Sequence, residues 1–188
     1  KHIGYLASDA LEGRRTGTSG EMKAVTYISE QYKKMGISPM GDHNTYIQTF
    51  EINEGKEIKK GTFLDADAKP LKLNEDYWPF SFSPSNISFN GYAYYEGLKA
   101  QQPWLYDLKN ILDNNRNNPH FDLLQHIHEQ TKNAKEKGAN ALLVYNTSSI
   151  NDGLEFSSRN KENTEVLPVF YLTTKGIKKI KEGNHING

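Results

Sequence analysis

The sequence predicts an α+β protein in which a β-rich sandwich or barrel carries flanking helices and follows a helix-and-strand N-terminal segment. Two patterns predict this class. Apolar residues recur at helical spacing over 25–35 and again over 124–134. Between them, residues 62–95 alternate apolar and small polar side chains and are broken by proline and glycine, as short strands and turns are. The 188 residues suffice for one or two domains with a buried core.

The N-terminal residues predict two helices, a glycine-rich loop and a strand. Residues 2–10 form the short first helix and residues 11–20 the loop. The second helix starts at Thr18, whose hydroxyl pairs with the Glu21 carboxylate as a capping box. In that motif each side chain binds a free backbone N–H at the helix start. Residues 46–52 then alternate as a strand does.

The second helix has one apolar stripe and a defined end. Val25, Ile28, Tyr32 and Met35 are spaced by three, four and three residues, so they share one helical face. Gly36 ends the helix as a left-handed cap, and Pro39 prevents its continuation.

The aromatic residues of the β-rich stretch have two alternative uses. We expect them to form the core of the sandwich or barrel; the alternative is an exposed stacking platform. They are Trp78, Phe80, Phe82, Phe89, Tyr92 and Tyr94.

The C-terminal part alternates helix and strand. A third helix is predicted over 121–137, followed by a buried strand over 141–145. Residues 146–164 are polar and predict a long loop, after which residues 167–172 form a second buried strand. Thr173 and Thr174 then cap a short helix.

Composition excludes several classes of function. The formal net charge is +0, which argues against nucleic acid and anionic membranes as partners, because both require a basic field. There is no cysteine, so disulfides, thiolate zinc sites and cysteine nucleophiles are excluded. No apolar run approaches the roughly 18 residues that a membrane span needs.

The glycine-rich loop does not fit a phosphate-binding motif. A P-loop places four residues between its glycines and follows them with lysine, whereas three residues separate Gly13 from Gly17 here. The dinucleotide motif fails as well, because no strand precedes the loop. A weak anion site at the start of the second helix stays open as an alternative.

The histidines do not predict a zinc site. His126 and His128 are two apart on a helix and therefore point to nearly opposite faces. His120 and Asp122 have a spacing that some zinc enzymes use, but a catalytic zinc needs about three protein ligands.

Other catalytic groups are also missing from the pattern. There is no Gly-x-Ser-x-Gly nucleophile motif. The carboxylate pairs Asp65 with Asp67, and Glu155 with Glu162, lie in polar loops, where we expect solvated charge.

The opening segment resembles a known family. Residues 5–52 read YLASDALEGRRTGTSGEMKAVTYISEQYKKMGISPMGDHNTYIQTFEI and resemble the N-terminal segment of the two-zinc aminopeptidases, of the bacterial leucyl aminopeptidase and plasma glutamate carboxypeptidase kind. The resemblance implies that residues 1–54 belong to an α/β peptidase domain of an exported (secreted, periplasmic or surface-associated) enzyme. It also implies an architectural role for Asp9, Glu12, Gly13, Arg14, Gly17 and Gly20.

A second resemblance covers the C-terminal part. AKEKGANALLVYN and VLPVFYLTTKGIKKI resemble the hallmarks of the protease-associated domain, which many members of this family carry as an insertion. The resemblance implies a protease-associated domain over residues 55–188.

The family's zinc ligands lie beyond this inserted domain, in a His-x-Asp and a Glu-Glu pair that have no counterpart here. We therefore expect no catalytic or metal-binding residue in this chain, and zinc only in a full-length enzyme. The expected partners are the missing peptidase domain and a peptide or protein substrate. The loop expected to face them contains Asn151, Asp152, Gly153, Leu154 and Glu155.

Two alternatives remain open. The chain is a free-standing protein- or peptide-binding module with no peptidase attached, or a self-sufficient hydrolase whose site the sequence does not reveal.

Overall fold

The computed structural model describes residues 2–52, 54–97 and 99–188. It divides into two compact units, Lys1–Ile52 (unit 1) and Asn53–Gly188 (unit 2). Helices and two sheets together confirm the α+β class. Among the described residues, no helix is both long and apolar enough to cross a membrane.

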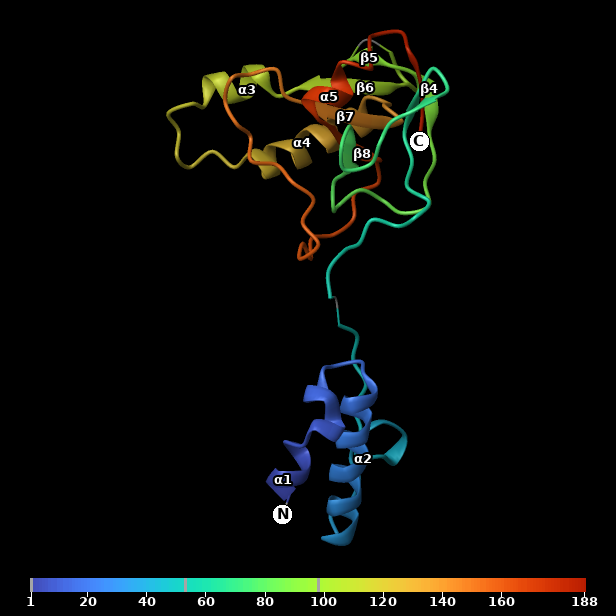
Figure 1. The fold of residues 1–188 in the computed structure, drawn as a ribbon, viewed down its shortest axis with the longest axis vertical. Coiled ribbons are helices and arrows are strands. Elements are labelled where there is room, and N and C mark those ends of the chain that lie inside the picture. Colours follow the sequence, from blue (N-terminus) through green and yellow to red (C-terminus); the bar gives the residue numbers. More distant parts are fainter. Residues whose placement is uncertain (1, 53, 98) are drawn as a thin grey trace. The chain divides into compact units, whose positions relative to one another are not determined.

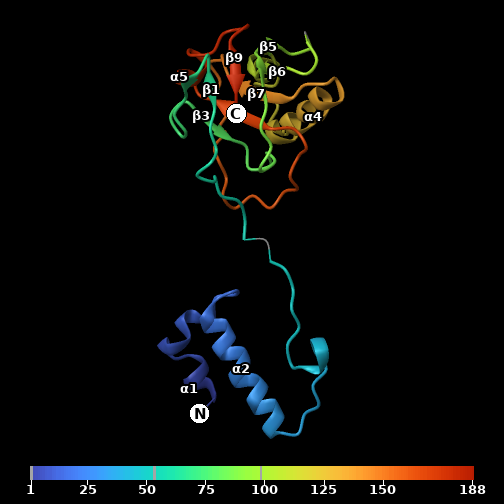
Figure 2. The ribbon, with the colours of Figure 1, turned by 90° about the vertical axis from the view of Figure 1, so that its right-hand side faces the viewer.

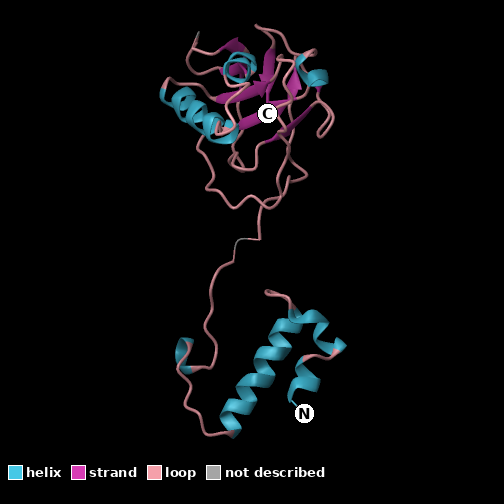
Figure 3. Cartoon of the chain, turned by 90° about the vertical axis from the view of Figure 1, so that its left-hand side faces the viewer, coloured by secondary structure: helices cyan, strands magenta, loops and turns pink. Residues whose placement is uncertain are grey.

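Unit 1 is built from helices and turns, with no strand among its described residues (Figure 3). Its elements are α1 (His2–Leu6), the 3-10 segment η1 (Asp9–Arg14), α2 (Ser19–Lys34) and the 3-10 turn η2 (Asp42–Asn44). Part of the expected loop over 11–20 is therefore the 3-10 segment η1.

The ends of α2 follow from its sequence. The Thr18 hydroxyl accepts the N–H of Glu21 at 3.5 Å, as the capping box requires. The Glu21 carboxylate reaches one residue farther than expected and accepts the N–H of Gly17 at 2.6 Å. At the other end Gly36 has φ of +73°. Its N–H binds the Lys33 carbonyl, as in a Schellman motif.

The strand predicted over 46–52 is wrong. Residues 47–52 are irregular in the structure, and Tyr46 lies in a bend. Alternation of apolar and polar residues is not sufficient for a strand, because a strand needs a neighbour that satisfies its backbone hydrogen bonds. The described residues of unit 1 provide no such neighbour.

Unit 1 buries few side chains for its length. Leu11 and Ala24 are its buried apolar residues. The apolar stripe predicted along α2 is largely exposed: Ile28 is 37%, Tyr32 42% and Met35 63% exposed. The helix thus forms where the sequence predicts it, but its apolar face has little to pack against within unit 1.

Unit 2 contains two sheets, whose strands can be followed in Figures 1 and 2. The five-stranded sheet has the order β3-β8-β7-β6-β5, with parallel pairing from β8 to β5 and an antiparallel β3 at one edge. Its strands are β3 (Tyr77–Pro79), β5 (Tyr94–Tyr95), β6 (Pro103–Asp107), β7 (Ala141–Tyr145) and β8 (Val169–Leu172).

The second sheet has four antiparallel strands in the order β2-β1-β9-β4. They are β1 (Asp65–Ala66), β2 (Lys69–Pro70), β4 (Asn90–Tyr92) and β9 (His185–Asn187). Unit 2 thus pairs a largely parallel sheet with an antiparallel one. This arrangement does not by itself identify a sandwich or barrel of protease-associated type, which stays a prediction.

Three helices complete unit 2: α3 (Lys109–Asn114), α4 (Leu123–Glu136) and α5 (Thr174–Ile177). α4 and the buried strands β7 and β8 are predicted correctly. Thr173 caps α5 as expected, accepting the N–H groups of Lys175 and Gly176. β6 and α3 were not predicted.

The central sheet is buried on both faces. Alternate residues of β7 enter two different cores: Leu143 packs with Ile186 of the second sheet, and Val144 packs in the core that contains Ile127 of α4. All five residues of β7 are buried, as is typical of a parallel sheet that is covered on both sides. Most of the aromatic residues considered for a stacking platform belong to these cores, including Phe80, Phe82 and Phe89.

We predict that limited chymotrypsin digestion cleaves after Tyr27 and Tyr32 of α2 well before it cleaves after Tyr145 of β7. Cleavage requires local opening, and α2 has few buried contacts to resist it. Mass spectrometry of early digestion products measures the order of cleavage. Equal protection of the two segments would contradict the prediction.

Candidate functional site

The glycine-rich segment of unit 1 closes tightly on the start of α2. Glu12, Gly13 and Arg14 have positive φ values of 48°, 72° and 57°, so the chain reverses there. Leu11 is 1% exposed, and a Cβ atom on Gly20 would lie 2.1 Å from the Leu11 carbonyl oxygen. The segment and the helix can approach this closely because residue 20 has no side chain.

The start of α2 is poorly suited to an anion. Its capping N–H groups already bind acceptors of the chain, since Gly17 donates to Glu21 and Glu21 donates to Thr18. The Glu21 carboxylate also places a negative charge where an anion would bind. The geometry therefore gives no support to the alternative of an anion site here.

The histidines of unit 2 are engaged separately. Asp122 caps α4 by accepting the N–H of Gln125 at 2.9 Å. The neighbouring His120 is exposed, and its backbone N–H donates to Asn118. Across residues 2–52, 54–97 and 99–188, no group of three or more His, Asp or Glu side chains could hold a metal ion. These residues do not fit a catalytic zinc.

His126 and His128 have different surroundings, as their spacing predicts. The His126 Nε2 atom is 2.7 Å from the Tyr106 hydroxyl. Burial lowers the pKa of His126 and raises the pKa of Tyr106 to about 12. Both shifts favour a neutral pair, which is typical of a packing contact.

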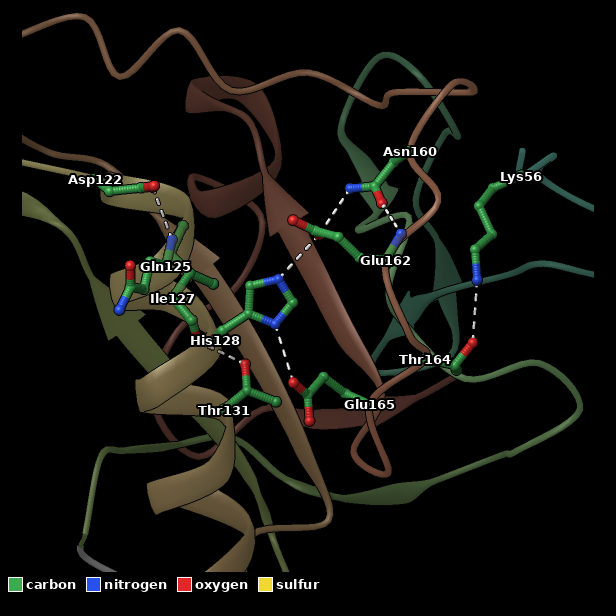
Figure 4. A network of polar contacts seen from close by, with 10 residues as sticks. All are labelled: Lys56, Asp122, Gln125, Ile127, His128, Thr131, Asn160, Glu162, Thr164 and Glu165. Atoms are coloured by element: carbon green, nitrogen blue, oxygen red, sulfur yellow. Dashed lines mark hydrogen bonds and ion pairs between the residues drawn. The ribbon is translucent and has the colours of Figure 1, made fainter. Parts of the chain in front are cut away.

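His128 lies between the carboxylates of Glu162 and Glu165, in the connection between β7 and β8 (Figure 4). Its Nδ1 atom is 3.0 Å from Glu165 Oε1, and its Nε2 atom is 3.1 Å from Glu162 Oε2. The expectation that Glu162 carries a simply solvated charge is therefore wrong. Sequence reasoning did not single out Glu165 or this contact, because the partners are 34 and 37 residues apart.

The loop residues expected to face a partner have two kinds of environment. Asp152 accepts hydrogen bonds from the Asn146 amide at 2.8 Å and from the Tyr171 hydroxyl at 2.6 Å. Leu154 packs against the core beneath α4. Asn151, Gly153 and Glu155 are exposed. Asp152 and Leu154 therefore attach the loop, whereas the exposed three are available for contact.

Asp152 also affects the acid–base properties of Tyr171. Burial, together with the hydrogen bond to the Asp152 carboxylate, raises the pKa of Tyr171. The phenol therefore remains a hydrogen-bond donor throughout the physiological pH range. This contact joins the loop directly to β8 in the centre of the unit.

Unit 2 also contains a groove of about 400 Å³. Its walls come from segments far apart in the sequence, so no local pattern predicts it. Aromatic side chains and hydroxyls line it together with two lysines and one glutamate: Lys56, Glu57, Lys59, Phe63, Phe80, Ser81, Ser83, Ser85, Ser88, Phe156, Thr164 and Phe170. Such a mixture of apolar and polar lining is common in ligand-binding sites.

The chain was compared with known proteins. No protein-family model matches it, and neither does any curated protein. Among solved structures, it resembles an aminopeptidase from Aneurinibacillus sp. strain AM-1, with 15% identity and a TM-score of 0.46 over 95% of this chain and 42% of that one. It also resembles a zinc aminopeptidase from Bacillus subtilis, with 17% identity and a TM-score of 0.46 over 99% of this chain and 41% of that one. The chain thus spans about two fifths of the length of these structures.

We predict that Tyr171→Phe lowers the free energy of unfolding by about 1 kcal/mol, the usual contribution of one hydrogen bond. Amide exchange in residues 150–155 should become faster, because Asp152 loses one of its two side-chain partners. Urea unfolding and hydrogen exchange measure these effects. Tyr95→Phe is the matched control, since Tyr95 is 49% exposed. Equal stability of the two variants would show that the contact does not hold the loop.

Proposed function

We propose that this chain combines the opening segment of a peptidase domain, residues 1–54, with an inserted protease-associated domain, residues 55–188. The parent protein would be an exported, zinc-dependent aminopeptidase. In it, this chain would be non-catalytic and would shape substrate access or mediate protein contacts.

The exposed apolar surface of unit 1 is the observation that carries this proposal. Met40 is 92% exposed, Phe50 is 70% exposed and Met35 is 63% exposed. Exposed apolar side chains of this size gain free energy when another part of a protein covers them. The remainder of a peptidase domain is the partner that the resemblance of the opening segment implies.

The contacts of the candidate metal-binding side chains support a non-catalytic role. Asp122 caps a helix, His126 binds a tyrosine and His128 binds two glutamates, so each is already engaged. The zinc of such an enzyme would therefore be held by residues other than these. The contribution of this chain would be made by the exposed loop residues Asn151 and Glu155.

A free-standing binding module is the second candidate function. Unit 2 favours it, because it has its own two cores and a groove of about 400 Å³. A unit with these features can fold and bind a peptide without a peptidase attached to it.

We predict that isothermal calorimetry detects no tight zinc binding by this chain, and that the chain releases no amino acid from peptide substrates when zinc is added. The reason is that its described His, Asp and Glu side chains do not gather into a ligand set.

Tight, stoichiometric binding of two zinc ions would overturn the non-catalytic assignment. The double variant His120→Ala/Asp122→Ala would then identify the site, since that pair has the only zinc-like spacing recognised in the sequence. Its matched control is His185→Ala.

A further inference from the structure

The contact of His128 with two carboxylates requires a particular charge state. A neutral imidazole donates a hydrogen bond from one ring nitrogen only, whereas the imidazolium ion donates from both. Both ring nitrogens of His128 face carboxylate oxygens, at 3.0 and 3.1 Å. Ionised carboxylates only accept hydrogen bonds, so both contacts are favourable together only when the ring carries two protons.

Both carboxylates are well placed to stabilise the protonated ring of His128. The Asn160 amide, 2.8 Å from Glu162, and the His128 ring keep the pKa of Glu162 below its ordinary value. Glu165 is shielded from water, since its side chain is 17% exposed, and the His128 side chain is 18% exposed. Limited contact with water strengthens a pairing of opposite charges.

The other groups around the ring do not replace its charge. The Phe82 ring lies 3.9 Å from the imidazole, centre to centre, and is fully buried. Asp122, the N-cap residue of α4, adds a negative charge that opposes ionisation of Glu162. Lys56 donates to the Thr164 hydroxyl at 3.1 Å. Within the described parts of the chain, His128 is the ion-pair partner of both glutamates.

The two glutamates that contact His128 are attached to the rest of unit 2 in different ways. The backbone N–H of Glu165 donates to the Phe82 carbonyl at 2.7 Å, which fixes that residue to the core. Glu162 is 46% exposed and is supported by Asn160, a neighbour in the same loop. If the ring loses a proton, the loop should therefore release at Glu162 and remain attached at Glu165.

The loop that Glu162 holds is also a wall of the groove. Phe156 and Thr164 line that groove and lie on either side of Glu162 in the sequence. Movement of this part of the loop would change the width of the groove, while β7 and α4 would keep their positions.

We propose that His128 is a proton-controlled latch for residues 155–164. In mildly acidic solution the imidazolium binds Glu162 and Glu165 and holds the loop against α4. As the pH rises and the ring loses a proton, one nitrogen lone pair faces a carboxylate, Glu162 is released and the groove beside Phe156 and Thr164 opens.

The closed state has a limit on each side of the pH scale. On the alkaline side it ends when His128 becomes neutral. On the acidic side it ends when Glu162 is protonated, and the lowered pKa of Glu162 moves that limit to more acidic solution.

Amide hydrogen exchange of the whole chain tests the latch. It is measured by mass spectrometry at about pH 5.5 and about pH 8.5, which bracket the range in which an imidazole changes charge, with correction for intrinsic exchange rates. Protection of residues 156–164 should fall by about tenfold at the higher pH, the change expected for loss of one hydrogen bond to a charged group. Protection of β7 should stay constant.

Three variants separate the latch from a structural role. Glu162→Gln leaves His128, Phe82 and Glu165 in place and should remove the pH dependence of loop protection, because the amide can accept from the protonated ring or donate to the lone pair of the neutral ring. His128→Gln should behave in the same way, with β7 protection confirming that it folds. His126→Gln is the matched control and should keep the pH dependence. Equal protection of the wild-type loop at both pH values, or retained pH dependence in Glu162→Gln, would overturn the proposal.

Discussion

The two-sided burial of β7 is the constraint on which the rest of unit 2 depends. Its five residues are all buried, so each face of the sheet needs a cover. α4 covers one face and the antiparallel sheet covers the other. Parallel strands also need long connections, which usually contain a helix. The connection from β7 to β8 contains none, and side chains hold it instead: Asp152 binds Tyr171, and His128 binds two glutamates.

Unit 1 presents the opposite situation. Its main helix has a well-formed cap at Thr18 and a well-formed end at Gly36, so local interactions are satisfied. Most of its large apolar side chains remain in contact with water, since Leu11 and Ala24 are the apolar residues that its described part buries. Helices in proteins owe most of their stability to packing of an apolar face. The contrast between the two units is therefore the physical basis of the proposed function, in which unit 1 packs against the rest of a peptidase domain.

Local signals in the sequence predicted the parts of the fold that depend on neighbours in the chain. The limits of α2, the position of α4 and the buried strand β7 follow from caps, helical spacing and an apolar run. The strand expected over 46–52 was wrong, since a strand depends on a partner elsewhere. The candidate site also depends on residues that are far apart in the sequence. His128 contacts Glu162 and Glu165, which are 34 and 37 residues away, and no rule of local spacing predicts such a contact.

Unit 2 has a complete core and unit 1 does not. Thermal unfolding of residues 53–188 and of residues 1–52, produced separately and followed by circular dichroism, tests it most directly. We expect residues 53–188 to unfold cooperatively, at a temperature within a few degrees of the main transition of the whole chain. Residues 1–52 should show no cooperative transition. A cooperative transition of residues 1–52 alone, or the lack of one in residues 53–188, would contradict the claim.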